Sequence, residues 1–164
     1  TEASWQREIA QKLCDMGVDA IIGGHPHVIE PVDVFTSEDG THKTFCAFSL
    51  GNQLSNQRRE MMRLKTGNTE DGLFIDLEIT RNKKGDVSLT GVKYIPTWVY
   101  KNASGPTYSI APVDDPSTVE EKTGIKGIQA QTCFWICSPN TRSTMHKRHM
   151  REKRTVYPAQ MIPA

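Results

Sequence analysis

The stretch "GVDAIIGGHPHVIEP", residues 17–31, decides how the rest of the chain is interpreted. A short apolar run over residues 18–24 predicts a strand that is apolar on both faces, which is typical of a covered sheet in an α/β layer. The run ends at two glycines, and two histidines follow with a proline between them. We therefore expect His25 and His27 just past a strand end, where open α/β sheets place their ligand sites.

The segment before this stretch has the period of a helix. Residues 4–16 carry apolar side chains at helical spacing, which predicts one apolar helix face. Ser4 can cap its start and Gly17 can close its end. The members of the predicted apolar face are Trp5, Ile9, Leu13 and Met16.

The segment after it predicts a hairpin. Residues 31–37 and 43–50 read as two strands, and Asp39-Gly40 between them is a typical hairpin turn. The second arm is nearly all apolar, so we expect it to be a central strand. Residues 55–70 show no clear period, and we expect a loop there.

A second pair of strands follows. Residues 71–81 alternate strictly and predict a half-exposed strand whose apolar face holds Leu73, Ile75, Leu77 and Ile79. In the next strand the apolar register slips at Gly91, which predicts a β-bulge. Pro96 lacks a donor, so we expect an edge or a bend from there on.

The C-terminal part has a different character. We divide the chain into residues 1–115, a folded domain, and residues 116–164, an irregular basic tail. Between Arg142 and Arg154 there are six Lys or Arg and one Glu, which is typical of a solvated or disordered segment. Such charge can attract an acidic polymer or nucleic acid, but the aromatic residues of a single-strand platform are lacking, and we expect no specific nucleic-acid partner.

Cysteines and overall composition constrain little. Cys14 and Cys46 read as buried small residues. The spacing of Cys133 and Cys137 to the two following histidines does not fit a zinc finger. The 164-residue chain has a formal net charge of +1, and no apolar run approaches the ~20 residues that span a bilayer. It opens with Thr rather than Met and with no signal peptide, so we expect a processed or truncated product.

Two histidines separated by one residue suggest a metal site. On an extended backbone, His25 and His27 point to the same side and can face one ion or two adjacent ions. Neutral imidazole is a good ligand for zinc, iron and related metals. The alternative is a pair of surface histidines beside a Pro turn. A catalytic zinc takes three protein ligands, so others must come from elsewhere.

Several motifs together resemble a known family. "GVDAIIGGHPHVIEPVDVF", "FSLGNQLSNQ", "DGLFIDLEITR" and "YIPTWVY" resemble the bacterial capsule-synthesis (poly-γ-glutamate synthesis) family, a branch of the calcineurin-like metallophosphatases. The resemblance covers about residues 3–100, and Gly-His-Pro-His followed by Ser-Leu-Gly-Asn is its most specific part. It implies the C-terminal part of an α/β/β/α sandwich, an α/β fold that is mostly β with one N-terminal helix.

The resemblance also implies a site. His25 would serve one divalent metal and His27 a second, with Mn, Fe or Zn as candidates, and two such ions polarise a phosphoryl group. Asn52 would contact substrate as a catalytic residue, although Gly51-Asn52 also reads as a simple turn. Glu30 and Asp33 are candidate second-shell acceptors for the histidines.

The chain departs from the family in ways that bear on function. The upstream metal-ligand blocks are absent, and Gln53 stands where the family has Phe. We therefore expect a metal-dependent phosphoesterase site that is incomplete in this chain, and a weak or inactive catalyst. The alternative is a non-catalytic module that binds an anionic polymer. The resemblance implies a cell-envelope or extracellular location, and exposed sheet edges predict a homo-oligomer.

Overall fold

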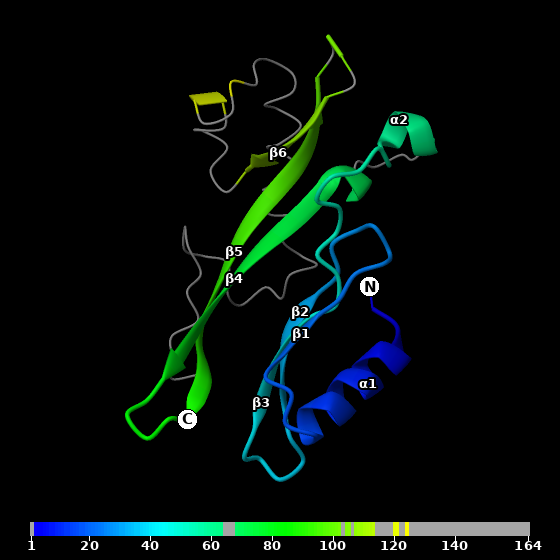
Figure 1. Ribbon diagram of the computed structural model, residues 1–164. Helices are drawn as coiled ribbons and strands as arrows, with labels where there is room; N and C mark the ends of the chain where they lie inside the picture. Colours follow the sequence, from blue (N-terminus) through cyan, green and yellow to red (C-terminus); the bar gives the residue numbers. More distant parts are fainter. Residues whose placement is uncertain are drawn as a thin grey trace.

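Two three-stranded sheets and one long helix make up the described part of the fold (Figure 1). The computed structural model describes residues 2–63, 68–102, 104–105, 107–113, 120–121 and 124. Most of the predicted tail, including Cys133, Cys137 and the basic run, lies outside the described residues. The elements are α1 (Ser4–Asp15), β1 (Ala20–Ile22), β2 (Val32–Thr36), β3 (Lys43–Ala47), α2 (Arg59–Met62), η1 (Asn68–Glu70), β4 (Asp71–Arg81), β5 (Val87–Lys101) and β6 (Tyr108–Pro112).

The first sheet has the strand order β1-β3-β2. β1 runs parallel to β3, and β2 and β3 form the predicted antiparallel hairpin, with Gly40 at a φ of 73° in its turn. The prediction of β3 as the central strand is confirmed. β1, expected to be covered on both faces, is only partly covered, because Ala20 and Ile21 are half-buried and Ile22 is 49% exposed. It is also an edge strand among the described strands.

Helix α1 covers one face of this sheet through its small residues. Ala10 and Cys14 are buried against Phe35, Cys46 and Phe48. The prediction that the apolar face of this helix packs against the sheet is wrong, because Trp5, Ile9 and Met16 are 60%, 48% and 79% exposed. The small residues leave room for the two phenylalanine rings, so the helix packs with this side toward the sheet.

The ends of α1 follow the predicted pattern only in part. The N-cap is Ala3 rather than Ser4, and the Gln6 side chain accepts a hydrogen bond from the Ala3 amide at 2.5 Å. Gly17, at a φ of 84°, follows the C-cap as predicted. The guanidinium of Arg7 lies over the Phe35 ring and pairs with a carboxylate of the sheet.

The second sheet has the strand order β4-β5-β6, with both pairs antiparallel. The predicted bulge is present, since the register shifts where Glu78 pairs with Gly91. The prediction for Pro96 is wrong, because β5 continues through it as the central strand. The Pro96 carbonyl accepts a hydrogen bond from the amide of Val113, just past the end of β6. The N–H that Pro96 lacks would therefore lie where the hydrogen-bonded ladder between β5 and β6 ends.

The two sheets pack face to face. A core of Phe45, Ala47, Leu89 and Val92 joins β3 to β5, and Ile75 and Leu77 of β4 pack against it. The helix, the first sheet and the second sheet thus form successive layers, which confirms the partial α/β sandwich. Within residues 55–70, expected to be loop, the described part contains the short helices α2 and η1.

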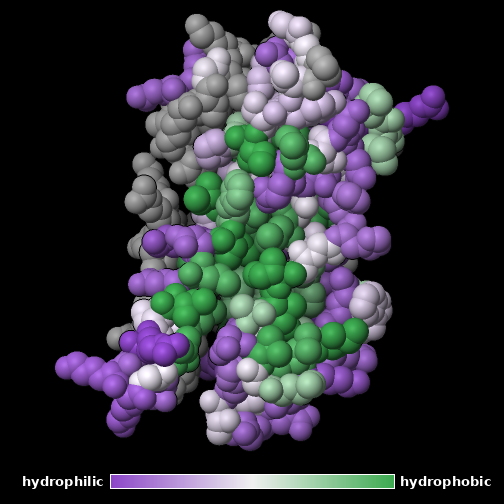
Figure 2. All heavy atoms as spheres, in the orientation of Figure 1, coloured by the Kyte–Doolittle hydropathy of each residue, from purple (hydrophilic) through white to green (hydrophobic). Residues whose placement is uncertain are grey.

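One face of the molecule is unusually apolar. Figure 2 shows apolar side chains over the middle and lower part of this face, where Figure 1 places α1, β1 and the far end of the β4–β5 hairpin. Exposed apolar residues of these elements include Ile9, Met16, Ile22, Ile79 and Val87. The edge of β1 and this apolar surface therefore adjoin in space.

Candidate functional site

The histidine loop crosses the end of the central strand. Residues 23–31 lead from β1, on one edge of the first sheet, to β2 on the other edge, and so pass over the C-terminal end of β3. The crossing is close at Gly23, where a Cβ atom would stand 2.1 Å from the carbonyl oxygen of Phe48. Only glycine allows this approach. The loop therefore lies where parallel strands end, as the sequence predicts.

The backbone of the loop differs from the sequence prediction. His25 and His27 have φ angles of 99° and 60°, and residues 25–28 form bends rather than an extended segment. The predicted extended backbone is thus wrong, and strand alternation does not determine on which side of the loop the two imidazoles lie. Both residues are exposed, and positive φ costs a non-glycine residue about 1–2 kcal/mol. Such strain is concentrated at functional sites.

The hairpin brings His27 next to Asn52. The ladder between β2 and β3 continues beyond the strands, since Ile29 and Leu50 form a bridge in the same register. Two residues further out, the same register places His27 opposite Asn52. Their side chains meet there, with His27 Nδ1 and Asn52 Oδ1 2.8 Å apart. The two predicted motifs therefore meet at one point.

The contacts of Asn52 determine which nitrogen of His27 carries the proton. The Asn52 Nδ2 donates to the Thr69 carbonyl at 2.8 Å and to the His27 carbonyl at 3.3 Å, so the Oδ1 must be the atom that faces the ring. An amide oxygen only accepts, and His27 Nδ1 therefore bears the hydrogen. The lone pair is left on Nε2, which is the arrangement that outer-shell acceptors give to metal-binding histidines.

Asn52 is buried, while the histidine that it holds is exposed. Its side chain is only 6% exposed, and its backbone amide donates to the Asp71 carbonyl at 2.9 Å. Gly51, at a φ of 71°, supplies the turn that the sequence suggested, with a Cβ position 2.4 Å from the same Asp71 carbonyl. Asn52 thus positions a ring rather than standing open in the loop, and its predicted contact with substrate stays a prediction.

The two carboxylates predicted to orient the histidines occupy different places. Glu30 is 6% exposed, its amide donates to Ser49, and no donor within the described structure reaches its Oε2 atom. Asp33 accepts from Arg7 at 2.6 Å and from the amide of Val34, on the side of the sheet that α1 covers. No described contact joins either carboxylate to the histidines, and their second-shell roles stay predictions.

A buried acidic pair behind Asn52 is absent from the sequence predictions. Glu70 and Asp71 lie where η1 meets β4, and both are buried. Burial, with a further contribution from the Glu70 charge, raises the pKa of Asp71 to about 7. No local period marks residues 55–70, so the available signal was an acidic dipeptide at the start of the predicted strand.

The donor set fits part of a metal site. His27 has a free Nε2 lone pair, and His25 lies two residues away in the same loop. In the part of the chain that the structure describes, no group of three His, Cys, Asp or Glu side chains could hold a metal ion. The described residues therefore offer two imidazoles at most, fewer than the three protein ligands of a catalytic zinc.

Comparison with known proteins supports the resemblance to the capsule-synthesis family. Residues 1–57 match the family model described as bacterial capsule synthesis protein PGA_cap. The chain is 30% identical over 87 residues to the PGA biosynthesis protein CapA of Bacillus subtilis (strain 168). The match covers 53% of this chain and 20% of that relative, so the chain spans about a fifth of the relative's length. No solved structure matches the chain.

The predicted resemblance to the capsule-synthesis family is thereby confirmed, over residues 1–57 for the family model and over 87 residues for the relative. The match includes both the Gly-His-Pro-His segment and the Ser-Leu-Gly-Asn segment. No helix among the described residues is long and apolar enough to cross a membrane.

Proposed function

We propose that this chain contributes two imidazole ligands, His25 and His27, to a metal site of a capsule-biosynthesis protein that acts on a phosphoester or an anionic polymer. The observation that supports this most is the Asn52 contact, which keeps the Nε2 lone pair of His27 available. The strained loop backbone and its place at the strand ends add support. The capsule-synthesis family suggests poly-γ-glutamate as the polymer.

The chain's own residues have defined parts in this proposal. His27, oriented by Asn52, would hold one divalent ion, and His25 would hold the same ion or a second one. Bound metal would supply Lewis-acid polarisation of a phosphoryl oxygen and a water of lowered pKa. Further ligands must come from outside the described residues, so we expect weak or no turnover from this chain alone.

Metal titration of the purified chain tests the proposal. The background carries His146→Ala and His149→Ala, which removes the two tail histidines as adventitious ligands. We expect this background to bind Zn²⁺ or Mn²⁺ in calorimetry, and His25→Ala or His27→Ala to weaken or abolish the binding.

The matched control is His42→Ala. His42 lies at the hairpin turn, where its Nε2 contacts the Val18 carbonyl, away from the loop. Its removal should leave metal binding unchanged. Equal metal binding in the background and in both loop variants would refute the proposal. Binding of poly-γ-glutamate that persists in both loop variants, without hydrolysis of a phosphodiester, would favour the non-catalytic alternative.

A further inference from the structure

The junction between η1 and β4, residues 69–71, holds Asn52 from two directions. The Thr69 carbonyl accepts from the Asn52 side chain at 2.8 Å, and the Asp71 carbonyl accepts from its backbone amide at 2.9 Å. The position of this junction therefore sets the position of the Asn52 side chain. The Oδ1 of that side chain in turn accepts from the ring of His27.

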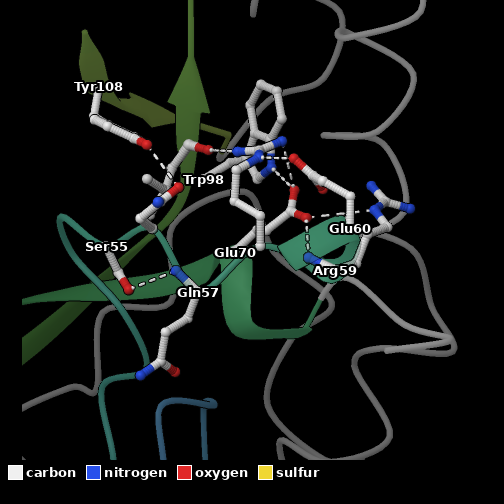
Figure 3. A network of polar contacts seen from close by, with 10 residues as sticks. Ser55, Gln57, Arg59, Glu60, Glu70, Trp98 and Tyr108 are labelled. Atoms are coloured by element: carbon white, nitrogen blue, oxygen red, sulfur yellow. Dashed lines mark hydrogen bonds and ion pairs between the residues drawn. The ribbon is translucent and has the colours of Figure 1, made fainter. Parts of the chain in front are cut away.

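Between these two carbonyls lies Glu70, whose side chain is only 1% exposed (Figure 3). Its Oε2 accepts from Trp98 Nε1 at 3.1 Å and pairs with Arg58 Nη2 at 3.1 Å. Its Oε1 accepts from the amide of Arg59 at 3.0 Å and from the Arg59 Nε at 3.4 Å. One carboxylate thus ties the junction to β5 and to the start of α2.

Arg58, one of the partners of Glu70, is itself held by further contacts. The Arg58 Nη1 donates to the Val99 carbonyl at 2.8 Å, and its Nε pairs with Glu60 at 2.7 Å. The Arg58 guanidinium also lies 5.8 Å from the centre of the Trp98 ring. The carboxylate therefore meets donors whose directions are set by backbone and aromatic contacts.

Stability alone does not explain this arrangement. A buried ion pair is often no more stabilising than apolar packing of similar volume, because both charges lose their hydration. A second carboxyl group, Asp71, is buried directly beside Glu70, which adds to the cost of charge at this place. Buried polar networks do fix geometry when every member has a partner. The Glu70 carboxylate has partners on both of its oxygens, and it lies directly behind Asn52.

We propose that Glu70 is a positioning residue of the histidine site: held by Arg58, Arg59 and Trp98, it fixes the two carbonyls that orient Asn52 and so sets the tautomer and direction of His27. This inference rests on the proposed function, and it names residues distant from the loop in sequence. Outer-shell partners of metal-binding histidines typically contribute about 10–100-fold to metal affinity, and Glu70 acts one step further out.

The test compares Glu70→Gln with the same background chain. The first readout is the tautomer of His27, measured by long-range ¹H–¹⁵N correlation NMR at a pH where the ring is neutral. The second is Zn²⁺ affinity by calorimetry, and the third is the midpoint of thermal unfolding. We expect the Nδ1–H form to predominate in the background and to lose its predominance in Glu70→Gln, with zinc binding weaker by about tenfold.

Two further variants separate positioning from general stability. Val92→Ala removes a buried side chain of β5 in the core between the sheets and lowers stability without touching the junction. We expect it to leave the His27 tautomer and zinc affinity unchanged. Trp98→Phe removes one donor to Glu70 but keeps a large aromatic ring, and it takes the place of Glu70→Gln if that variant does not fold.

The outcomes distinguish the two proposals. An unchanged His27 tautomer in Glu70→Gln, or in Trp98→Phe where the first does not fold, would overturn the positioning role whatever the unfolding midpoint does. An equal tautomer change in Val92→Ala would overturn it too. If the background binds no zinc, the metal proposal fails, but the tautomer measurement still decides the role of Glu70.

Discussion

Asp71 should make the stability of this protein fall as the pH rises toward neutrality. Its pKa is raised from 3.8 to about 7, first by burial and then by the neighbouring charge of Glu70. Below the unfolded value, both states carry the proton, and the folded state bears no penalty. As the pH rises from the unfolded pKa to the folded pKa, Asp71 loses its proton in the unfolded state but keeps it in the folded state. The free energy of unfolding therefore decreases. Above the folded value, the loss is complete.

The size of this loss in unfolding free energy follows from the difference between the folded and unfolded pKa values of Asp71. Each pKa unit corresponds to about 1.4 kcal/mol, so a shift of about three units sets an upper bound of about 4 kcal/mol. Asp71→Asn keeps the shape of the neutral side chain and removes the titration. The variant should therefore match the parent near the unfolded pKa and exceed its stability near pH 7.

Urea unfolding between about pH 4 and pH 8 measures the difference. The control is Asp76→Asn, in the same strand, where the carboxylate is exposed and lies 3.7 Å from Lys93. We expect the control to follow the parent within about 0.5 kcal/mol at every pH. Parallel profiles for the parent and Asp71→Asn across the whole range would refute the reasoning, because they would show that Asp71 titrates alike in both states.

Three other predictions follow from the same structure. In urea unfolding, the free energy of unfolding of His25→Gly should exceed that of His25→Ala by about 1 kcal/mol, because only glycine adopts the φ angle of residue 25 without strain. Equal values would contradict this. Gly51→Ala should lower stability by more than Gly40→Ala, since both have positive φ but only Gly51 meets another backbone atom, and equal losses would count against it. The chain should associate through the β1 edge, with which no described strand pairs on its outer side, and Ile22→Lys should reduce the mass seen by light scattering. A monomeric parent would refute this.

The sequence predicted the strands well where neighbouring residues alone decide them. The Asp39-Gly40 turn and the slip at Gly91 are both local signals, and the structure has the hairpin and the bulge at those places. The apolar period of α1 was also real, but period alone does not say which face packs. The face that packs is the one that meets Phe35, Cys46 and Phe48, and these residues lie far along the chain.

The site was predicted only in part, for a physical reason. His25 and His27 were found as residues, but the backbone of their loop is dictated by the crossing over β3, which no local pattern encodes. Glu70 was missed because its partners come from two segments separate from its own, residues 58–59 and Trp98. A buried carboxylate is recognised by its surroundings, and those exist only after the sheets have formed.

The contact between His27 and Asn52, by contrast, was within reach of the sequence. A two-residue turn centre fixes the register of an antiparallel pair, and the pairing can be extended outward from it. His27 precedes Asp39 by as many residues as Asn52 follows Gly40, so the two must lie opposite each other if the ladder persists. The number of residues between the two motifs therefore determines whether the hairpin register brings His27 and Asn52 together. This gives the spacing a physical basis: a one-residue change in either arm would move the amide away from the ring, because neighbouring residues point to opposite faces.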